Sequence, residues 1–268
     1  MVGLLIGCAI LALFPLFSVF LYVCQQGLPG LHVNFFTSLP KPVGEVGGGM
    51  ANAVLGSLIL ITLASLIGIP VGIATGVYLS EYGKTKLSMI LRFCTELLAG
   101  VPSIIIGIFA YSLFVIPMGR FSSYAGGAAL AVIMIPTVAR TTEELLKLVP
   151  VHIREAGLAL GISRWKVTLI IVLRGSLSGI MTGVMLGLAR VTGETAPLLF
   201  TALGSQYWPR SLDQPIASLP VQIYTYAISP FEEWHQQAWT GALVLVLFVF
   251  ILNLTTRMIL KRHAPAKD

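Results

Sequence analysis

Long uninterrupted apolar stretches run through most of this chain and limit what it can fold into. Five of them are clear in the sequence: about residues 2–24, 52–79, 97–118, 167–189 and 238–260. A sixth stretch, over about 124–139, is shorter and rich in small residues. One helical pass through a bilayer takes about 20 apolar residues at a rise of about 1.5 Å each. Charged residues make up only 10% of the chain, against about 25% in a soluble domain. The sequence therefore predicts an all-α integral membrane protein with about six transmembrane helices.

Lysine and arginine gather on one side of these predicted spans. The side reached after the second, fourth and sixth spans carries Lys84, Lys86, Arg92, Arg140, Lys147, Arg154, Arg164, Lys166, Arg257, Lys261, Arg262 and Lys267. The opposite loops carry Lys41, Arg120 and Arg210. Because positive residues are retained on the cytoplasmic side of a membrane, both termini are predicted to be cytoplasmic. The net charge of +6 is then a signal of topology, and nucleic acid is not an expected partner.

The chain divides at a Gly- and Pro-rich stretch that ends near residue 50. Residues 1–50 are predicted to form a retained transmembrane helix and an outer loop, since no basic segment or small-residue cleavage site marks a signal peptide. Residues 51–264 are predicted to form the main transmembrane domain, with a cytoplasmic tail at 265–268. A second outer loop, about 195–237, carries several Tyr and Trp residues and apolar patches. We expect this loop to lie at the membrane interface or to fold back over the protein.

Two predicted spans carry a glycine at every fourth position. These residues are Gly68, Gly72 and Gly76 in one span, and Gly179, Gly183 and Gly187 in another. Positions four apart lie near one face of a helix, and glycine there lets two helix backbones approach closely in lipid. We expect these faces to pack within the subunit; a seam against a partner subunit is the alternative.

No motif for catalysis, metal binding or nucleotide binding is present in the sequence. The segment 81–85 (EYGKT) partly matches a phosphate-binding loop, but that loop needs glycine where this chain has Tyr78. The four histidines are scattered, and no serine, histidine and acid combine into a nucleophile pattern. The chain is therefore expected to bind no metal or cofactor and to be no enzyme. If its function needs ATP, a partner must supply the site that binds ATP.

A short amphipathic segment interrupts the apolar chain at about residues 150–162. Pro150 suits the start of a helix and Gly161 suits its end, and the residues between them are too few to cross a bilayer. The flanking charges place this helix on the cytoplasmic side. Its small residues would let it enter a groove of a partner, whereas a helix attracted to anionic lipid at the membrane surface is the alternative.

The spacing of this segment resembles the EAA loop of ABC importer permeases. That pattern is EAA, three residues, G, nine residues and I-x-L-P; this chain has Glu155, Ala156 and Gly157, then Gly161, then IVL at 171–173. It departs twice, with Gly157 in place of the second alanine and an arginine in place of the closing proline. The resemblance implies a type I ABC importer permease fold in which this helix is the coupling helix that docks on a cytoplasmic ATPase. The residues implied in coupling are Arg154, Glu155, Ala156, Gly157 and Gly161.

The arginine at the proline position is Arg174, which falls about 12 Å beyond Lys166 if the helix is continuous. An arginine at that depth must extend to the interface, form an ion pair or face the protein interior.

Four further stretches narrow the resemblance to the A-type permease subunits of phosphate ABC importers. They are TELLAGVPSIIIGIF (95–109), IPTVARTTEELLKLVP (135–150), LARVTGETAPLLFTALG (188–204) and LPVQIYTYAISP (219–230). The resemblance implies import of inorganic phosphate by alternating access across the bacterial cytoplasmic (inner) membrane. The partners that it implies are a second homologous permease subunit of the C type, two copies of an ABC ATPase that binds ATP and Mg²⁺, an extracytoplasmic phosphate-binding protein, and membrane lipid.

Arg190, Glu194 and Thr195, near the outer end of the fifth span, are the candidate residues of the substrate pathway. Arg190 and Glu194 are four apart, so on a continuing helix they share a face and can pair. A guanidinium suits a tetrahedral oxyanion, and a carboxylate beside it would prevent the anion from binding too tightly for release. The alternative is an ion pair that only locks the span to its loop.

Other charged residues are predicted to form structural ion pairs at the inner ends of the spans. Arg92 and Glu96 are four apart at the start of the third span. Arg140, with Glu143 and Glu144, is expected at the inner end of the fourth span, where it would orient the coupling helix.

Three other functions stay open on the sequence. The same fold could import another oxyanion, such as molybdate, sulfate or phosphonate. An ATP-independent channel or carrier would not need an EAA-type loop, and a purely structural or assembly protein would leave the ATPase unaffected.

Overall fold

The computed structural model describes residues 2–45 and 47–263, and its regular structure in these ranges is helical throughout. The first half contains α1 (Val2–Gly27), α2 (Val33–Thr37), α3 (Ala51–Glu81), α4 (Lys86–Gly100), α5 (Ser103–Ala110), α6 (Ile116–Met118) and α7 (Ser123–Lys147). The second half contains α8 (Val151–Ala159), α9 (Arg164–Lys166), α10 (Leu173–Gly175), α11 (Leu177–Thr192), α12 (Ala196–Thr201), α13 (Leu219–Ala227) and α14 (Glu232–His263). A 3₁₀ turn, η1 (Leu28–Gly30), follows α1, and two π-helical segments, η2 (Tyr111–Val115) and η3 (Val167–Val172), lie before α6 and α10. The predicted tail at 265–268 lies outside the described residues.

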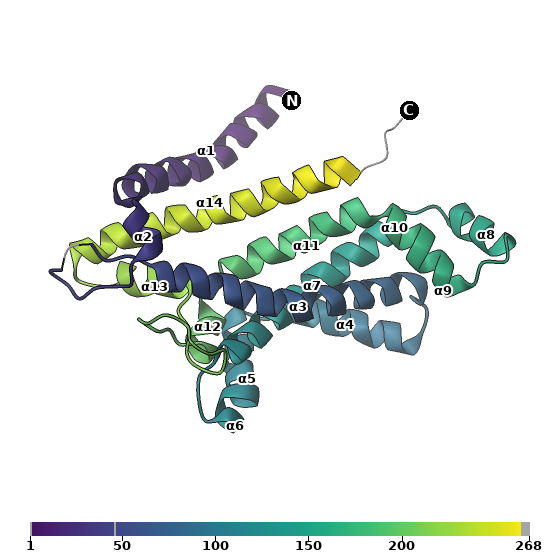
Figure 1. Cartoon of the computed structure of the whole chain (residues 1–268). Helices are drawn as coiled ribbons and strands as arrows, with labels where there is room; N and C mark the ends of the chain where they lie inside the picture. Colours follow the sequence, from purple (N-terminus) through teal and green to yellow (C-terminus); the bar gives the residue numbers. More distant parts are fainter. Residues whose placement is uncertain (1, 46, 264–268) are drawn as a thin grey trace.

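Helix α7 forms the centre of the molecule, between α3 and α11 (Figure 1). The two glycine series both face it. A Cβ at Gly72 would stand 2.7 Å from the Val138 Cβ, and one at Gly183 would stand 2.6 Å from the Thr141 Cβ. These glycines therefore let α3 and α11 pack closely on α7, which confirms the expectation of packing within the subunit.

Four helices are long and apolar enough to cross a membrane by themselves: α1, α3, α7 and α14. The short stretch 124–139 belongs to α7, which is longer than expected because it continues through polar residues to Lys147. The chain has six spans if each of two bent helix pairs counts as one. It is a multi-pass membrane protein.

The two bent pairs correct the prediction of unbroken helices over 97–118 and 167–189. The first pair, Lys86–Gly100 and Ser103–Met118, bends by 108° at an extended Pro102, which has no N–H to continue the helix. The second pair, Arg164–Gly175 and Leu177–Thr192, bends by 72°. A π-helical segment and a Gly–Ser pair, both common at helix kinks, lie at this bend.

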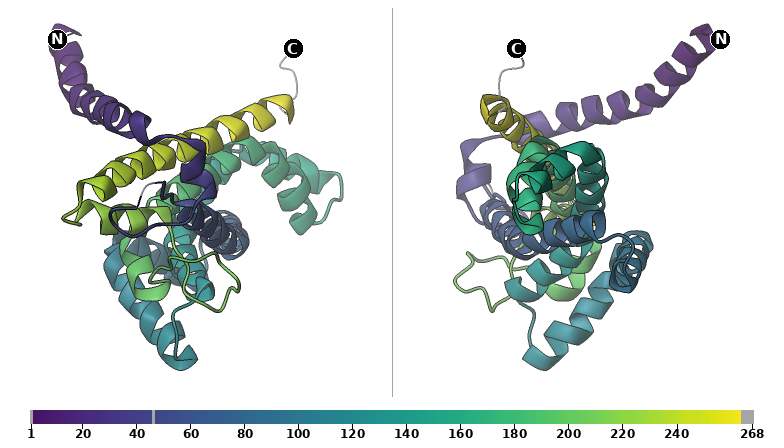
Figure 2. Two further views of the ribbon diagram at one scale, coloured as in Figure 1. Left: turned by 60° about the vertical axis from the view of Figure 1, so that its left-hand side comes forward. Right: turned by 90° about the vertical axis from the view of Figure 1, so that its right-hand side faces the viewer.

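Helix α1 is attached to the rest of the molecule mainly at its C-terminal end (Figure 2). Gly27 is its one buried residue among those described, and its carbonyl accepts a hydrogen bond from the Thr240 hydroxyl at 3.2 Å. Tyr22 meets Trp239 of α14 edge to face, with ring centroids 5.1 Å apart. Residues 2–22 of α1 are exposed, as expected for a helix that contacts lipid.

The long loop predicted at 195–237 folds back over the spans. It contains α12 and α13, and α13 packs on α14. Asn52, near the start of α3, donates to the Ser205 carbonyl at 2.6 Å, and the Ser57 hydroxyl accepts from the Leu219 N–H at 2.8 Å. These buried contacts select the second of the two expected arrangements, with the loop folded back on the protein.

Candidate functional site

The predicted short helix is present as α8, at the end of the molecule opposite the junction of α1 and α14 (Figure 1). Pro150 is its N-cap, with an extended backbone at φ −58° and ψ 142°. Gly161 lies just beyond its end with φ +77°, a left-handed conformation that favours glycine. The Gly161 N–H donates to the Leu158 carbonyl at 2.9 Å, so the helix ends where the sequence predicts.

Helix α8 has one exposed face and one face against the protein. Glu155, Ala156 and Leu158 are exposed, whereas Gly157 is buried. A Cβ at Gly157 would stand 3.0 Å from the Val167 Cγ2 of η3, closer than side chains normally approach. Glycine in place of the second alanine of the EAA pattern therefore seats α8 closely on η3, and the remaining EAA residues face outward, available to a partner.

Arg154 lies between α8 and the rest of the protein rather than on the exposed face. Its Nε donates to Glu81 Oε1 at 3.1 Å, Nη1 to the Val149 carbonyl at 2.6 Å, and Nη2 to the Leu146 carbonyl at 2.8 Å. The side chain of Arg154 is 19% exposed and that of Glu81 is 7% exposed. Glu81 was not predicted as a site residue. Its position in the sequence could have identified it, because a carboxylate at the C-terminal end of a long helix is unfavourable unless a cation lies beside it.

Arg174 lies at the bend between α10 and α11, not within a straight span. Its side chain is exposed, and the chain turns by 72° two residues later. In Figure 1, α9 and α10 cross the α8 end of the molecule before α11 runs back through it. The arginine therefore occupies the end of the helical bundle, and the bend that proline would have caused is made by Gly175 and Ser176.

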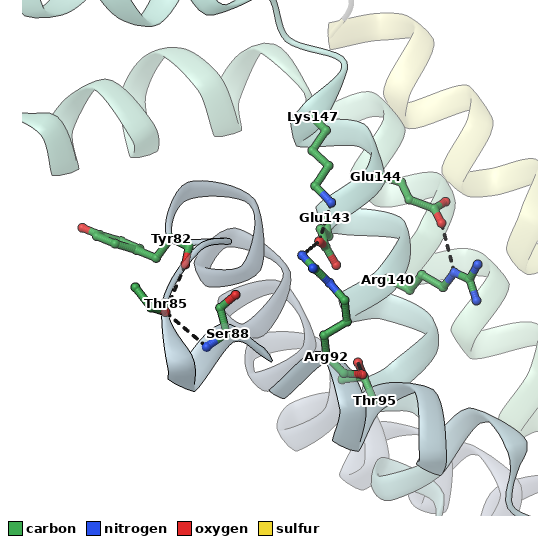
Figure 3. A network of polar contacts seen from close by, with 9 residues as sticks. All are labelled: Tyr82, Thr85, Ser88, Arg92, Thr95, Arg140, Glu143, Glu144 and Lys147. Atoms are coloured by element: carbon green, nitrogen blue, oxygen red, sulfur yellow. Dashed lines mark hydrogen bonds and ion pairs between the residues drawn. The ribbon is translucent and has the colours of Figure 1, made fainter. Parts of the chain in front are cut away.

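A network of ion pairs joins α4 to α7 at this same end (Figure 3). The nearly buried Glu143 accepts from Arg92 at 2.5 Å and from Lys147 at 2.6 Å. Arg140 pairs with Glu144 at 3.0 Å, and both side chains are largely exposed.

Two predicted pairings in this network differ from the structure. Arg92 contacts Glu143 of α7 instead of Glu96, and Arg140 pairs with Glu144 but not with Glu143. The reason is that α4 packs on α7, which brings Arg92 within reach of an acid from another helix. Of the segment 81–85, Glu81 ends α3 and residues 82–85 form a turn, in which the Thr85 hydroxyl caps α4 by accepting the Ser88 N–H at 3.2 Å.

The predicted substrate-pathway residues lie together at the other end of α11. The Arg190 Nε is 4.0 Å from Glu194 Oε1, at the outer limit of an ion pair, and its Nη1 is 3.5 Å from the Thr137 hydroxyl of α7. The helix does not continue to Glu194, because α11 ends at Thr192. Thr195 is the N-cap of α12, without a side-chain capping bond. The Arg190 side chain is 40% exposed and its two polar contacts are long, so the guanidinium keeps donors available to an anion.

The described residues contain no group of three or more His, Cys, Asp and Glu side chains that could hold a metal ion. In the loop between α12 and α13, the Ser211 hydroxyl and the Arg120 guanidinium lower the pKa of Asp213. Asp213 pairs with Arg120 at 2.9 Å and so joins this loop to the one before α7.

Comparison with known proteins agrees with this architecture. Residues 68–267 match the family model of the binding-protein-dependent transport system inner membrane component. The phosphate transport system permease protein PstA of Yersinia pestis is 46% identical over 94% of this chain and 86% of its own length. The protein of the same name from Xylella fastidiosa (strain Temecula1) is 48% identical over 89% of this chain and 84% of its own. The probable PstA of Methanocaldococcus jannaschii is 37% identical over 94% and 89%.

A solved structure supports the fold. An inward-facing MetNI methionine ABC transporter chain aligns with a TM-score of 0.64 at 20% identity, over 81% of this chain and 98% of that one. The chain therefore belongs to the inner membrane components of binding-protein-dependent transport systems and, among them, to the family of the permease protein PstA.

Proposed function

We propose that this chain is a permease subunit of an ATP-driven importer that carries inorganic phosphate across the bacterial cytoplasmic membrane by alternating access. The observation that carries this proposal is identity of 46–48% to proteins named as phosphate transport permeases over about nine tenths of the chain. The subunit would provide the pathway and a docking helix, while a partner would hydrolyse ATP.

The proposed complex contains this chain, a second homologous permease of the C type and two cytoplasmic ATPases, with an extracytoplasmic protein delivering phosphate. The exposed face of α8 supports ATPase docking, because Glu155, Leu158 and Leu160 project away from the subunit. Both termini would then be cytoplasmic, on the same side as α8 and the basic residues.

Arg190 supports the assignment of the substrate. An arginine always carries its charge and presents donors in a fork that matches the oxygens of phosphate. Its contact with Glu194 is long, so an entering anion would not have to break a tight ion pair.

Uptake of labelled phosphate into vesicles that hold the complete complex tests this function. We expect phosphate uptake to depend on ATP and to be inhibited only weakly by molybdate, sulfate or phosphonate. Arg190→Lys should lower uptake while the complex still assembles, because a single ammonium cannot make the same forked contact. Normal uptake by Arg190→Ala would contradict the role of this residue. Preferential uptake of another oxyanion would show that phosphate is not the main substrate.

A further inference from the structure

The contacts of Arg154 give α8 a second attachment besides its packing on η3. The three nitrogens of the guanidinium bind three different groups, at 2.6 Å to 3.1 Å. Glu81 is the last residue of α3, and Leu146 lies in the last turn of α7. One side chain of α8 therefore holds the inner ends of both spans.

The chemistry of each acceptor favours this contact. The last carbonyls of a helix lack their usual partner within the helix. That of Leu146 accepts the Val149 N–H at 3.3 Å and, at the shorter distance of 2.8 Å, Nη2 of Arg154. A carboxylate at a helix C-terminus opposes the helix dipole, and Glu81 is also 7% exposed, so it needs a cation beside it. Arg154 meets both requirements with one planar group.

A second arginine strengthens the end of α3. Arg164 of α9 donates from Nη2 to the Glu81 carbonyl at 3.0 Å, and its guanidinium carbon lies 5.1 Å from the centre of the Tyr82 ring. Tyr82 in turn stacks on Tyr78, with centroids 5.2 Å apart. The end of α3 is thus held from α8 and from α9, the helices on either side of Gly161.

We propose that Arg154 is a positioning residue that connects the coupling helix to α3 and α7, so that a displacement of α8 moves both spans together. This inference rests on the proposed function, in which an ATPase displaces α8. The exposed face of α8 receives the movement, and Arg154 on its opposite face passes it to α3 through Glu81 and to α7 through the Leu146 carbonyl. Without Arg154, α8 would keep its contact with η3 through Gly157 and would lose these bonds to α3 and α7.

The test compares ATP hydrolysis with phosphate uptake in vesicles that hold the complete complex. In Arg154→Gln we expect assembly and ATP hydrolysis to be retained, and the ATP hydrolysed per phosphate imported to rise roughly 2- to 30-fold. Glu81→Gln should act in the same direction. The double variant should be no worse than Arg154→Gln, because Glu81→Gln weakens a contact that Arg154→Gln already removes. Arg174→Gln is the matched control, an exposed arginine at the same end of the protein that should leave the ratio unchanged.

If the role of Arg154 were purely structural, Arg154→Gln would lower the amount of complex without changing the ATP hydrolysed per phosphate imported. An unchanged ratio in Arg154→Gln, or a double variant in which the two effects add, would overturn the inference. If the Arg154→Gln complex does not assemble, the ratio measured for Glu81→Gln tests the inference instead. Glu81→Gln leaves the hydrogen bonds of Arg154 to the Val149 and Leu146 carbonyls in place. Absence of ATP-dependent phosphate uptake by the unmodified complex would instead contradict the proposed function.

Discussion

At the scale of single residues, Glu143 and Glu144 are neighbours in sequence with different surroundings. Glu143 is 8% exposed in its side chain and binds two cations, whereas Glu144 is 59% exposed and binds one. We expect Glu143→Gln to lower the free energy of unfolding by about 2 kcal/mol, because it weakens two charged hydrogen bonds at a nearly buried site.

Glu144→Gln is the matched control for this prediction. It breaks an exposed pair between residues four apart, which is worth about 0.5 kcal/mol or less. Unfolding of the purified protein by SDS in mixed micelles measures both changes. Equal losses in the two variants would show that the contact of α4 with α7 does not depend on Glu143.

The ion pairs also show how far spacing in the sequence predicts contacts. The pair Arg140–Glu144 was predicted correctly, because residues four apart share a helix face. Arg190 and Glu194 also lie close, at 4.0 Å, although α11 ends at Thr192 before it reaches Glu194. The partner of Arg92 was wrong, since the acid that it binds is 51 positions away on another helix. The inward orientation of Arg154 was missed for the same reason: its partner Glu81 is 73 positions away.

At the scale of elements, the glycines of α3 fix its distance from α7. We expect Gly72→Ala to lower the free energy of unfolding by about 1–3 kcal/mol, because its Cβ would stand 2.7 Å from the Val138 Cβ. The control is Gly7→Ala in α1, where nothing lies within 4 Å of the added atom. The same SDS titration should show little change in the free energy of unfolding for Gly7→Ala. An unchanged free energy of unfolding in Gly72→Ala would mean that α3 and α7 can move apart without loss of stability.

The end of α8 offers a test of backbone conformation that does not involve packing. A Cβ added at Gly161 or at Gly175 would have no neighbour within 4 Å, but of these two residues only Gly161 has a positive φ, of +77°. Gly161→Ala should therefore strain the end of α8 by about 1–2 kcal/mol and reduce the amount of ATPase that copurifies with the subunit. Gly175→Ala should retain the ATPase, and equal retention by both variants would count against a need for this helix end in docking.

The elements themselves were largely predictable, and the bends were not. Hydropathy, Pro150 and Gly161 located the spans and α8, because a bilayer and a helix end impose simple requirements on sequence. The apolar run 167–189 predicts one straight span, yet the chain bends at Ser176. A bend depends on which neighbours the two segments pack against, which a hydropathy pattern does not contain.

At the scale of the whole molecule, α8 and the outer loop lie at opposite ends of the spans, and the membrane must pass between them. Leu160 is 80% exposed beside α8, and Tyr207 is 76% exposed in the loop after α12. Cysteine at either position should therefore react readily in a chain whose Cys8, Cys24 and Cys94 are replaced. In intact cells, a maleimide that does not cross membranes should label Tyr207→Cys and should label Leu160→Cys only after permeabilisation.

Added ATPase should then protect Leu160→Cys from labelling, because the docking face of α8 would be covered. Labelling of Leu160→Cys in intact cells would reverse the orientation derived from the basic residues, and labelling of both positions from one side would contradict the folded arrangement itself.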